Sequence, residues 1–377
     1  MCAKERCLGF FLVLAASASA WGSATISQAI DDGAGYLVSS QEGDGSWAGA
    51  EALTGPIVSG LVNAYAVKGN ASYKAAADAG GNYILDLSGY GQSGFSLTGE
   101  ESYSLARLSE IAGDPASNTW RTVVSDFHQL LNSYAYTSTF IAGIRSGYPD
   151  DVDSLPLFDL AHHTLAAYYV DASDKGIFRQ AVIDTLADVT SDDWYPVMSL
   201  GAAVSALAVT GDGLDSTVIS TSGYWAGVQL DDLPGILAGH QAVGGSYPDS
   251  FYWRFDHTGN PAAGLTEDTV FGTLGLLAAG ADARWDYGPE VLAARRVLTN
   301  GDNYGFASPD YGVMADGAAY NHIWDGGLYG PGDQYVYVGE TLQALPEPGT
   351  MAILVLGSVL LARGRSKRRR LCGGRAR

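Results

Sequence analysis

Two pairs of acidic residues stand where helices are expected to begin. Glu100 and Glu101 precede one apolar stretch, and Glu267 and Asp268 precede another. Two carboxyl groups on separate helices can serve as the acid and the base of a glycosidase when they lie roughly 5 to 10 Å apart. Acidic residues in a first turn also stabilise a helix through its dipole, so a purely structural role is the alternative for each pair.

A second set of titratable residues lies in the middle of an expected helix, in the stretch DLAHHTLAAYY. Asp159 precedes His162 by three residues and His163 by four, so one histidine could share a helical face with the carboxylate. This arrangement suits a general base oriented by a carboxylate, or two metal ligands. Adjacent helical residues point about 100° apart, which disfavours two ligands for one ion. A buried, hydrogen-bonded histidine without a chemical role is the alternative.

The richest mixture of aromatic and charged side chains occurs in SYPDSFYWRFDHTGN, residues 246–260, and a second such stretch surrounds Trp324. Rings beside arginine and aspartate suit stacking on sugars and hydrogen bonding to them, and loops of this kind often carry binding sites. The alternative is a lid that packs over the end of the fold. The residues expected to bind a ligand are Tyr252, Trp253, Arg254, Asp256, His257 and Trp324.

No cofactor is expected from the residue pattern, and Ca²⁺ is the metal that the sequence leaves open. Asp-rich turns at residues 150–153, 192–193 and 231–232 offer the oxygen ligands that Ca²⁺ prefers, but none fits an EF-hand loop. All three cysteines lie within the first seven or the last six residues. A disulfide framework, a thiol nucleophile and a cysteine-ligated zinc are therefore excluded from the part between.

A repeated helical hairpin is expected to position these residues. A turn of small residues that carries an aromatic side chain recurs six times, at steps of 46 to 59 residues. The aromatic residues of these turns are Trp47, Phe95, Tyr148, Trp194, Tyr247 and Phe306. Self-similarity at such a period indicates an array of similar units.

Two kinds of helix alternate along this repeat. Helices with one apolar face are expected at residues 26–40, 73–87, 120–131, 178–189 and 286–299. Helices that are apolar on most sides, as buried helices are, are expected at residues 56–67, 101–111, 155–170, 196–209, 266–279 and 333–344. The last of these could instead be a strand, and residues 215–240 are left without an assigned helix.

The alternation predicts an all-α fold in which outer helices enclose a ring of inner ones. Six hairpins of this kind give an (α/α)6 toroid, formed by residues 21–345. An open solenoid of helix pairs is the alternative. The closed ring is preferred because a solenoid leaves its concave helices half exposed.

A glutamine precedes an aromatic residue by six positions at two places in the chain. These motifs contain Gln41, Gly45 and Trp47, and Gln241, Gly245 and Tyr247. The first, preceded by Tyr36-Leu37, resembles the QW motif of squalene and terpene cyclases and of the related prenyltransferase-like toroids. The resemblance implies a structural role, in which the amide bonds backbone groups at helix ends.

The chain departs from the chemistry of those families. The cyclases carry an Asp-x-Asp-Asp acid, whereas this chain has Asp150-Asp151-Val152-Asp153, in which Asp153 suits a helix N-cap. Protein prenyltransferases hold zinc with Asp, Cys and His, and the cysteine is missing here. Both inherited activities are therefore disfavoured.

Both ends of the chain have the layout of export signals. Residues 1–20 combine basic residues, an apolar run and Ala18-Ser19-Ala20, as a secretory signal peptide does. A buried N-terminal helix is the alternative. At the other end, the sequence Pro346, Glu347, Pro348 is followed by 13 uncharged residues and an arginine cluster. Thirteen helical residues span about 20 Å, which is short for a hydrocarbon core of about 30 Å.

The tail, residues 346–370, resembles the PEP-CTERM sorting signal of Gram-negative bacteria that make exopolysaccharide. The resemblance implies export across the inner membrane, anchoring by the short apolar helix, and processing by the membrane protease exosortase. The processed protein is then expected at the cell surface or outside the cell. A plain C-terminal membrane anchor is the alternative.

The part between these two signals is strongly acidic. Of 21 Lys and Arg residues, two lie in the signal and eight in the tail, which leaves 11; of 41 Asp and Glu residues, 39 remain. The net charge of residues 21–345 is therefore near −28, which disfavours nucleic acid and anionic lipid as partners. The function expected first is binding of extracellular polysaccharide by an exported surface protein. A polysaccharide lyase or glycoside hydrolase and a terpenoid-cyclase-like enzyme are the alternatives.

Overall fold

Helices make up most of the described residues of the structure, which is a computed structural model. It describes residues 27, 29–49, 51–112, 119–133, 137–147, 155–188, 197–211, 213–243, 251–252, 266–280, 290–291, 294–295 and 333–345. Within these residues the only strands are β1 (Ala242–Val243) and β2 (Phe251–Tyr252), which pair antiparallel. The fold is therefore all-α, as the sequence predicts.

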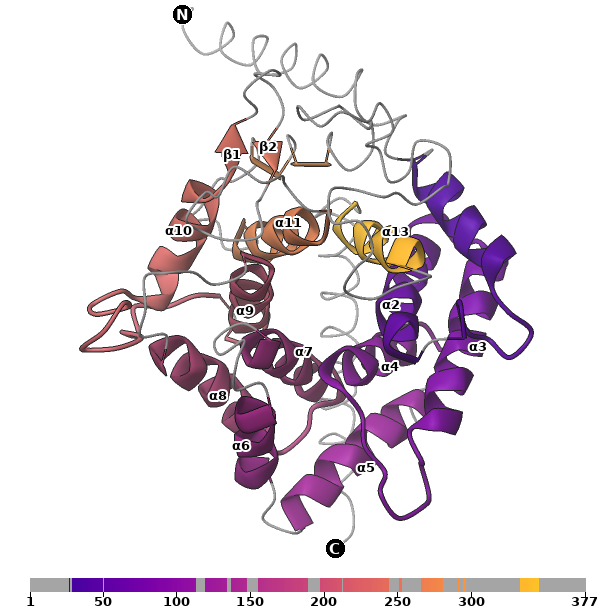
Figure 1. The fold of residues 1–377 in the computed structure, drawn as a ribbon, viewed down its shortest axis with the longest axis horizontal. Coiled ribbons are helices and arrows are strands. Elements are labelled where there is room, and N and C mark those ends of the chain that lie inside the picture. The colour runs from indigo at the N-terminus through magenta and orange to yellow at the C-terminus, as the bar shows by residue number, and fades with distance from the viewer. Residues whose placement is uncertain are drawn as a thin grey trace, which may run out of the picture. The chain divides into compact units, whose positions relative to one another are not determined.

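Six helices form a closed cycle of packing contacts. Each packs against the next one along the chain, and the last packs against the first, around a common centre (Figure 1). They are α2 (Glu51–Lys68), α4 (Gly99–Ile111), α7 (Leu155–Val170), α9 (Val197–Thr210), α11 (Thr266–Gly280) and α13 (Asp333–Ala344). These are the six stretches predicted as inner helices. Residues 333–344 form a helix and not a strand.

The other helices lie outside this cycle (Figure 1). Residues 29–40 are helical. The outer helices that follow are α3 (Ala71–Leu87), α5 (Thr119–Ser133), α6 (Thr137–Gly147), α8 (Lys175–Asp188) and α10 (Leu233–Gly239), the last after the short 3-10 helix η1 (Leu230–Asp232). The sequence does not predict α6, whose C-terminal end falls at an expected turn.

Glycines allow neighbouring helices of the cycle to approach closely. A Cβ atom on Gly60 would overlap backbone atoms of Gly339, where α2 meets α13. A Cβ atom on Gly201 would overlap the carbonyl group of Phe271, where α9 meets α11. The contact between the last helix and the first therefore depends on a pair of glycines facing each other.

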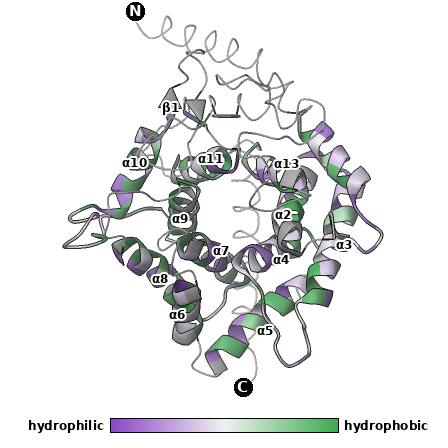
Figure 2. Cartoon of the chain, viewed as in Figure 1, coloured by the Kyte–Doolittle hydropathy of each residue, from purple (hydrophilic) through white to green (hydrophobic). Residues whose placement is uncertain are grey.

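The helices of the cycle differ in polarity. Nearly every residue of α9 is buried and the helix is drawn largely in green in Figure 2, whereas α4 and α7 also carry hydrophilic positions in purple. A helix enclosed on all sides by protein is expected to be apolar throughout. The polar positions on α4 and α7 therefore require an explanation, and they lead to the candidate site.

Candidate functional site

The first wall of the candidate site is one face of α4. Thr98 and Glu101 form a capping box at its start: Thr98 Oγ1 accepts from Glu101 N (3.3 Å), and Glu101 Oε2 accepts from Thr98 N (2.8 Å). Glu101 is thereby engaged in holding the helix end. Glu100, Tyr103 and Arg107 follow one another at spacings of three and four residues, so they lie on one side of the helix.

The second wall is the neighbouring face of α7, on which Asp159, His162 and Tyr169 recur at helical spacing. Asp159 Oδ1 accepts a hydrogen bond from Gly99 N (2.6 Å), which joins this helix to the start of α4. His162 Nδ1 lies 2.9 Å from the carbonyl oxygen of Phe158, to which it donates. Burial lowers the pKa of His162 to about 4, so its imidazole is neutral at neutral pH.

The two walls meet in layers along their helices. At the first layer, the charge of Asp159 contributes to raising the pKa of Glu100. At the next, the rings of Tyr103 and His162 meet edge to face, with centroids 5.5 Å apart. At the third, Arg107 Nη1 donates to Tyr169 Oη (3.0 Å). Along α4 from its start, the site therefore presents first a carboxyl group, then a pair of rings, and then the guanidinium of Arg107.

Three carboxyl groups from three different helices of the cycle influence one another. Burial raises the pKa of Glu100 well above its ordinary value, and the charge of Glu267 on α11 is the next cause. Burial also raises the pKa of Glu340 on α13 well above its ordinary value, followed by the charges of Glu267 and Glu100. The three carboxyl groups therefore act on one another's ionisation. Glu100, Glu267 and Glu340 are called the acidic cluster below.

The members of the acidic cluster differ in burial. Glu100 and Glu267 are partly exposed, whereas Glu340 is only 1% exposed. Glu340 Oε2 has no hydrogen-bond partner among the described residues. A buried carboxyl oxygen in this situation favours the protonated form. The cluster therefore contains two carboxyl groups that solvent can reach and a third, buried one whose protonated form is favoured.

The cation on α4 is already paired. Arg107 forms an ion pair with Glu110 (2.9 Å), and its Nη2 donates to Asn63 Oδ1 (2.8 Å). Its guanidinium also lies over the ring of Tyr169, 5.1 Å from the centroid. Arg107 therefore ties α2, α4 and α7 together, and its charge is balanced by Glu110 and not by the acidic cluster.

His163 belongs to a different environment from His162. Its ring stacks on Phe127 of α5, with centroids 5.8 Å apart, and it is fully buried. Burial lowers its pKa to about 3. Its Nε2 lies 3.9 Å from Asp159 Oδ2, and neither ring nitrogen has a hydrogen-bond partner within the described part of the chain. The two adjacent histidines therefore do not converge on one point.

Asp268, the fourth acid of the two predicted pairs, has a capping role. It is fully buried, and its Oδ1 accepts a hydrogen bond from Met198 N at the start of α9 (3.0 Å). Asp159 plays the corresponding role for α4. Of the predicted catalytic residues, the structure therefore brings Glu100 and Glu267 together in the acidic cluster and engages Glu101, Asp159 and Asp268 at helix starts.

Several of the predicted residues lie outside the described part of the chain. Tyr252 is described only as part of β2, where it pairs with Ala242. The residues outside are Trp253, Arg254, Asp256, His257 and Trp324 of the predicted ligand surface, Gly245 and Tyr247 of the second glutamine motif, and Pro346, Glu347 and Pro348 of the sorting signal.

Two residues of the site are not predicted from the sequence. Arg107 could have been found as a charged residue seven positions after Glu100 in an otherwise apolar helix. Glu340 lies in a stretch that could be read as helix or strand, so its orientation could not be assigned. The structure resolves that ambiguity by forming α13.

The glutamines of the two repeated motifs each donate to a backbone carbonyl group far along the chain. Gln41 Nε2 donates to Gly45 O and to Ala76 O, each at 2.9 Å. Gln241 Nε2 donates to Glu290 O (3.2 Å), 49 residues further along the chain. Trp47 is fully buried, and its Nε1 donates to the carbonyl oxygen of Leu37 (2.8 Å). The bond from Gln41 to Ala76 joins the end of the helix at residues 29–40 to α3.

Two further searches concern metals and membranes. In the described ranges, no group of three or more His, Cys, Asp or Glu side chains could hold a metal ion. The described helices include none that is long and apolar enough to cross a membrane. The Asp-rich turns at 150–153 and 192–193, and the predicted sorting helix, lie outside the residues that these searches cover.

Comparisons with protein-family models, with curated proteins and with solved structures give no match to this chain.

Proposed function

We propose that residues 21–345 form an (α/α)6 toroid, exported by the N-terminal signal and sorted by exosortase through residues 346–370. The closed cycle of six helices, with the other described helices outside it, supports the toroid. The open solenoid is disfavoured because α13 packs against α2. The export route rests on the sequence of the two ends. It places the protein where extracellular polysaccharide is present.

We further propose that the toroid hydrolyses glycosidic bonds of a polysaccharide. The observation that carries this function is the coupling of Glu100 and Glu267, two partly exposed carboxyl groups from different helices of the cycle. A glycosidase needs one carboxyl group that is protonated near neutral pH and one that is ionised. The raised pKa of Glu100 suits the acid, and the negative charge of Glu267 helps to keep the proton there.

The reaction follows from these two roles. Glu100 donates its proton to the glycosidic oxygen as the bond between this oxygen and the anomeric carbon breaks. A water molecule attacks the anomeric carbon and gives a proton to Glu267. Tyr103, which is partly exposed one turn after Glu100 on α4, would contact the sugar. Hydrolysis is favoured over elimination by a lyase, because a lyase must neutralise the carboxylate of a uronic acid and the acidic cluster would repel it.

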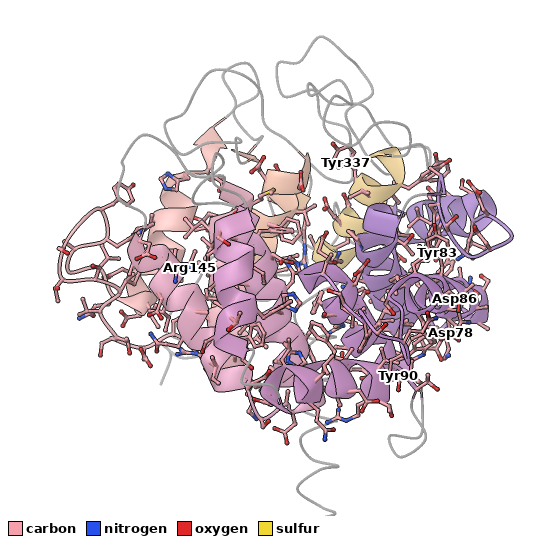
Figure 3. All side chains as sticks on the ribbon, turned by 60° about the horizontal axis from the view of Figure 1, so that its bottom comes forward. Asp78, Tyr83, Asp86, Tyr90, Arg145 and Tyr337 are labelled. Atoms are coloured by element: carbon pink, nitrogen blue, oxygen red, sulfur yellow. The ribbon has the colours of Figure 1, made fainter. Side chains whose placement is uncertain are left out.

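The test is release of reducing ends from a panel of polysaccharides, with the variant Glu100→Gln. We expect the wild-type protein to release ends from at least one polymer, and the variant to be slower by about 10²- to 10⁴-fold, as for loss of a general acid. The control is Asp86→Asn, which removes an exposed carboxylate on α3, outside the helix cycle (Figure 3). Equal rates for wild type and Glu100→Gln would remove Glu100 from the mechanism.

A second candidate function is non-catalytic binding of polysaccharide by an exported surface protein. The capping roles of Glu101, Asp159 and Asp268 favour it, because they show that much of the acid at the helix starts serves the architecture. The same polymer panel separates the two functions. Retention of a polymer without release of any reducing end would establish binding and reject hydrolysis.

Sorting is tested independently of the toroid. Replacing Pro346, Glu347 and Pro348 by alanine should abolish processing of the tail, so that the unprocessed mass persists in the membrane fraction. An unchanged mature mass after this replacement would reject the sorting proposal and would leave the proposed hydrolysis untouched.

A further inference from the structure

The acidic cluster restricts the kind of ligand that can bind beside it. We propose that the site takes a sugar polymer that carries free ammonium groups, such as a de-N-acetylated amino-sugar chain, and that binding of this polymer releases protons from the cluster. That the ligand is a polysaccharide rests on the proposed function. That it carries ammonium groups rests on the charges described below.

Glu340 provides an observation that is independent of the number of acids. Its side chain is 1% exposed, and its Oε2 has no hydrogen-bond partner among the residues that the structure describes. Burial raises the pKa of Glu340, and the charges of Glu267 and Glu100 raise it further. A buried carboxyl oxygen without a donor is unfavourable unless a proton or a nearby cation compensates it. In the absence of a cation, the protonated form of Glu340 is therefore favoured.

Among the residues that the structure describes, the groups around the cluster add negative charge and little positive charge. Asp268 lies beside Glu267 on α11, and Glu101 and Asp159 lie beside Glu100. The described side chains of α9 carry no charge, and His162 is neutral. Arg107 on α4 is paired with Glu110. Arg295 of the outer layer donates from Nε to Ala344 O (2.8 Å), at the end of α13.

This charge distribution discriminates among sugar polymers. A uronic acid would bring a further negative charge next to Glu100 and Glu267, and the Coulomb energy would oppose its binding. A neutral sugar would leave the charge uncompensated. An ammonium group would be attracted. Of the three kinds of sugar, only the one with an ammonium group therefore offsets the repulsion among the carboxyl groups of the cluster.

Binding of an ammonium group should therefore be linked to proton release. The proton on Glu340 is retained because the carboxyl group is buried and because the neighbouring carboxylates oppose its ionisation. A positive charge placed beside them offsets this effect and lowers the pKa of Glu340. The O–H bond breaks and the proton passes to the buffer, and no other bond changes. The sign is fixed: protons leave when the ligand binds.

The experiment is titration calorimetry of the full chain in two buffers with different ionisation enthalpies. The probes are oligomers of glucosamine, the same oligomers fully N-acetylated, oligogalacturonate, and spermidine as a non-sugar polyamine. In mildly acidic solution, where the amines are charged, we expect the glucosamine oligomer to bind at least about tenfold more tightly than the acetylated one. The heat should differ between the buffers, because protons are released.

The variant Glu340→Gln keeps the volume of the side chain and removes its proton equilibrium. We expect it to release fewer protons on binding the glucosamine oligomer than the wild type does, while Asp86→Asn on the outer face of α3 matches the wild type (Figure 3). If Glu340→Gln does not fold, as judged by its thermal transition, Glu267→Gln on α11 takes its place, because it removes a partly exposed member of the same cluster.

Several outcomes would overturn the inference. Equal affinity for acetylated and free-amine oligomers would reject the ammonium requirement, and proton release unchanged by Glu340→Gln would reject the role of the cluster. Spermidine binding as tightly as the glucosamine oligomer would reject the sugar assignment. Release of reducing ends from a neutral polymer alone would reject this inference and leave the proposed hydrolysis standing. Proton-linked binding of the free-amine oligomer without release of reducing ends would reject the proposed hydrolysis and leave this inference standing.

Discussion

Two contacts within the helix cycle begin with the same device and then diverge. Where α4 meets α7, Asp159 Oδ1 accepts a hydrogen bond from Gly99 N. Where α9 meets α11, Asp268 Oδ1 accepts one from Met198 N. In each contact an acid near the start of the later helix caps the start of the earlier one. The first contact is called the polar seam below, and the second the apolar seam.

Beyond the first turn the side chains of the two seams differ in polarity. The polar seam continues with the ring pair Tyr103 and His162 and then with the bond from Arg107 to Tyr169. The apolar seam continues with α9, which has no charged side chain. The difference shows that an acidic residue at a helix start does not by itself indicate a catalytic site. A site is indicated where polar side chains continue along the face for two further turns.

The largest expected effect of a substitution on stability lies in the apolar seam. Leu207 of α9 is fully buried, and Leu207→Ala should lower the free energy of unfolding by about 2–5 kcal/mol, measured by chemical denaturation. Under conditions in which the variant stays folded, polysaccharide cleavage should match the wild type. Loss of cleavage without loss of stability would contradict a purely structural role for Leu207.

The next effect concerns Glu340, whose buried carboxyl group lowers the stability of the folded state at neutral pH. Because its folded pKa is raised, its contribution to stability is present below the ordinary carboxyl pKa. This contribution is lost as pH rises from that value to the raised one. Glu340→Gln should therefore stabilise the protein at neutral pH, because the amide cannot ionise.

The measurement for Glu340→Gln is thermal unfolding at mildly acidic and at neutral pH. The wild type should lose stability between the two, and the variant should lose less. Some loss should remain, because the pKa of Glu100 is raised as well. A variant whose stability falls with pH as steeply as that of the wild type would show that Glu340 is not protonated in the folded protein.

Inner helices such as α9 and α11 could be predicted from the sequence because they are apolar around most of their circumference. The bounds of α7 are those predicted, whereas α2 begins before Pro56. Glu100 and Glu267 could be proposed as a pair because they begin separate inner helices. Their approach to each other depends on closure of the cycle, which the repeat suggests but does not require.

Other features depend on tertiary contacts that no local pattern shows. The sequence of α6, TSTFIAGIRSG, combines glycines with β-branched residues, which lower helix propensity. The helix places Phe140 against the rings of Phe127 and Phe178, so packing outweighs propensity. Glu340 could not be assigned to the site because residues 335–338 suit a strand as well as a helix. A helix and a strand place different side chains on the inward face.

A smaller effect distinguishes the two capping acids. Asp268→Ala and Asp159→Ala each remove an acceptor from a helix start, which costs about 0.5–2 kcal/mol. The cost should be greater for Asp268, which is fully buried, than for Asp159, whose side chain is 22% exposed. Thermal unfolding of the two variants side by side measures this difference. The reverse order would show that the caps are not equivalent devices.

The pH dependence of activity should also distinguish Asp159→Ala from Asp268→Ala. The charge of Asp159 contributes to the raised pKa of Glu100, so Asp159→Ala should move the alkaline limb of the pH–activity profile to lower pH. Asp268 is not among the groups that act on Glu100, and its removal should leave this limb in place. An identical shift in both variants would assign the limb to a group other than Glu100.

The smallest effect tests whether the third layer of the polar seam links two helices. Tyr169→Phe removes the hydroxyl that accepts from Arg107 Nη1 but keeps the ring beneath the guanidinium. We expect a loss of about 0.5–1.5 kcal/mol in unfolding free energy. The matched variant in the apolar seam is Thr273→Val, since Thr273 Oγ1 donates only to Thr269 O within its own helix (2.6 Å). Its cost should be nearer zero, because that carbonyl remains bonded within the helix. If both substitutions cost the same, the hydroxyl of Tyr169 does not join α4 to α7, and the contrast between the seams ends at the second layer.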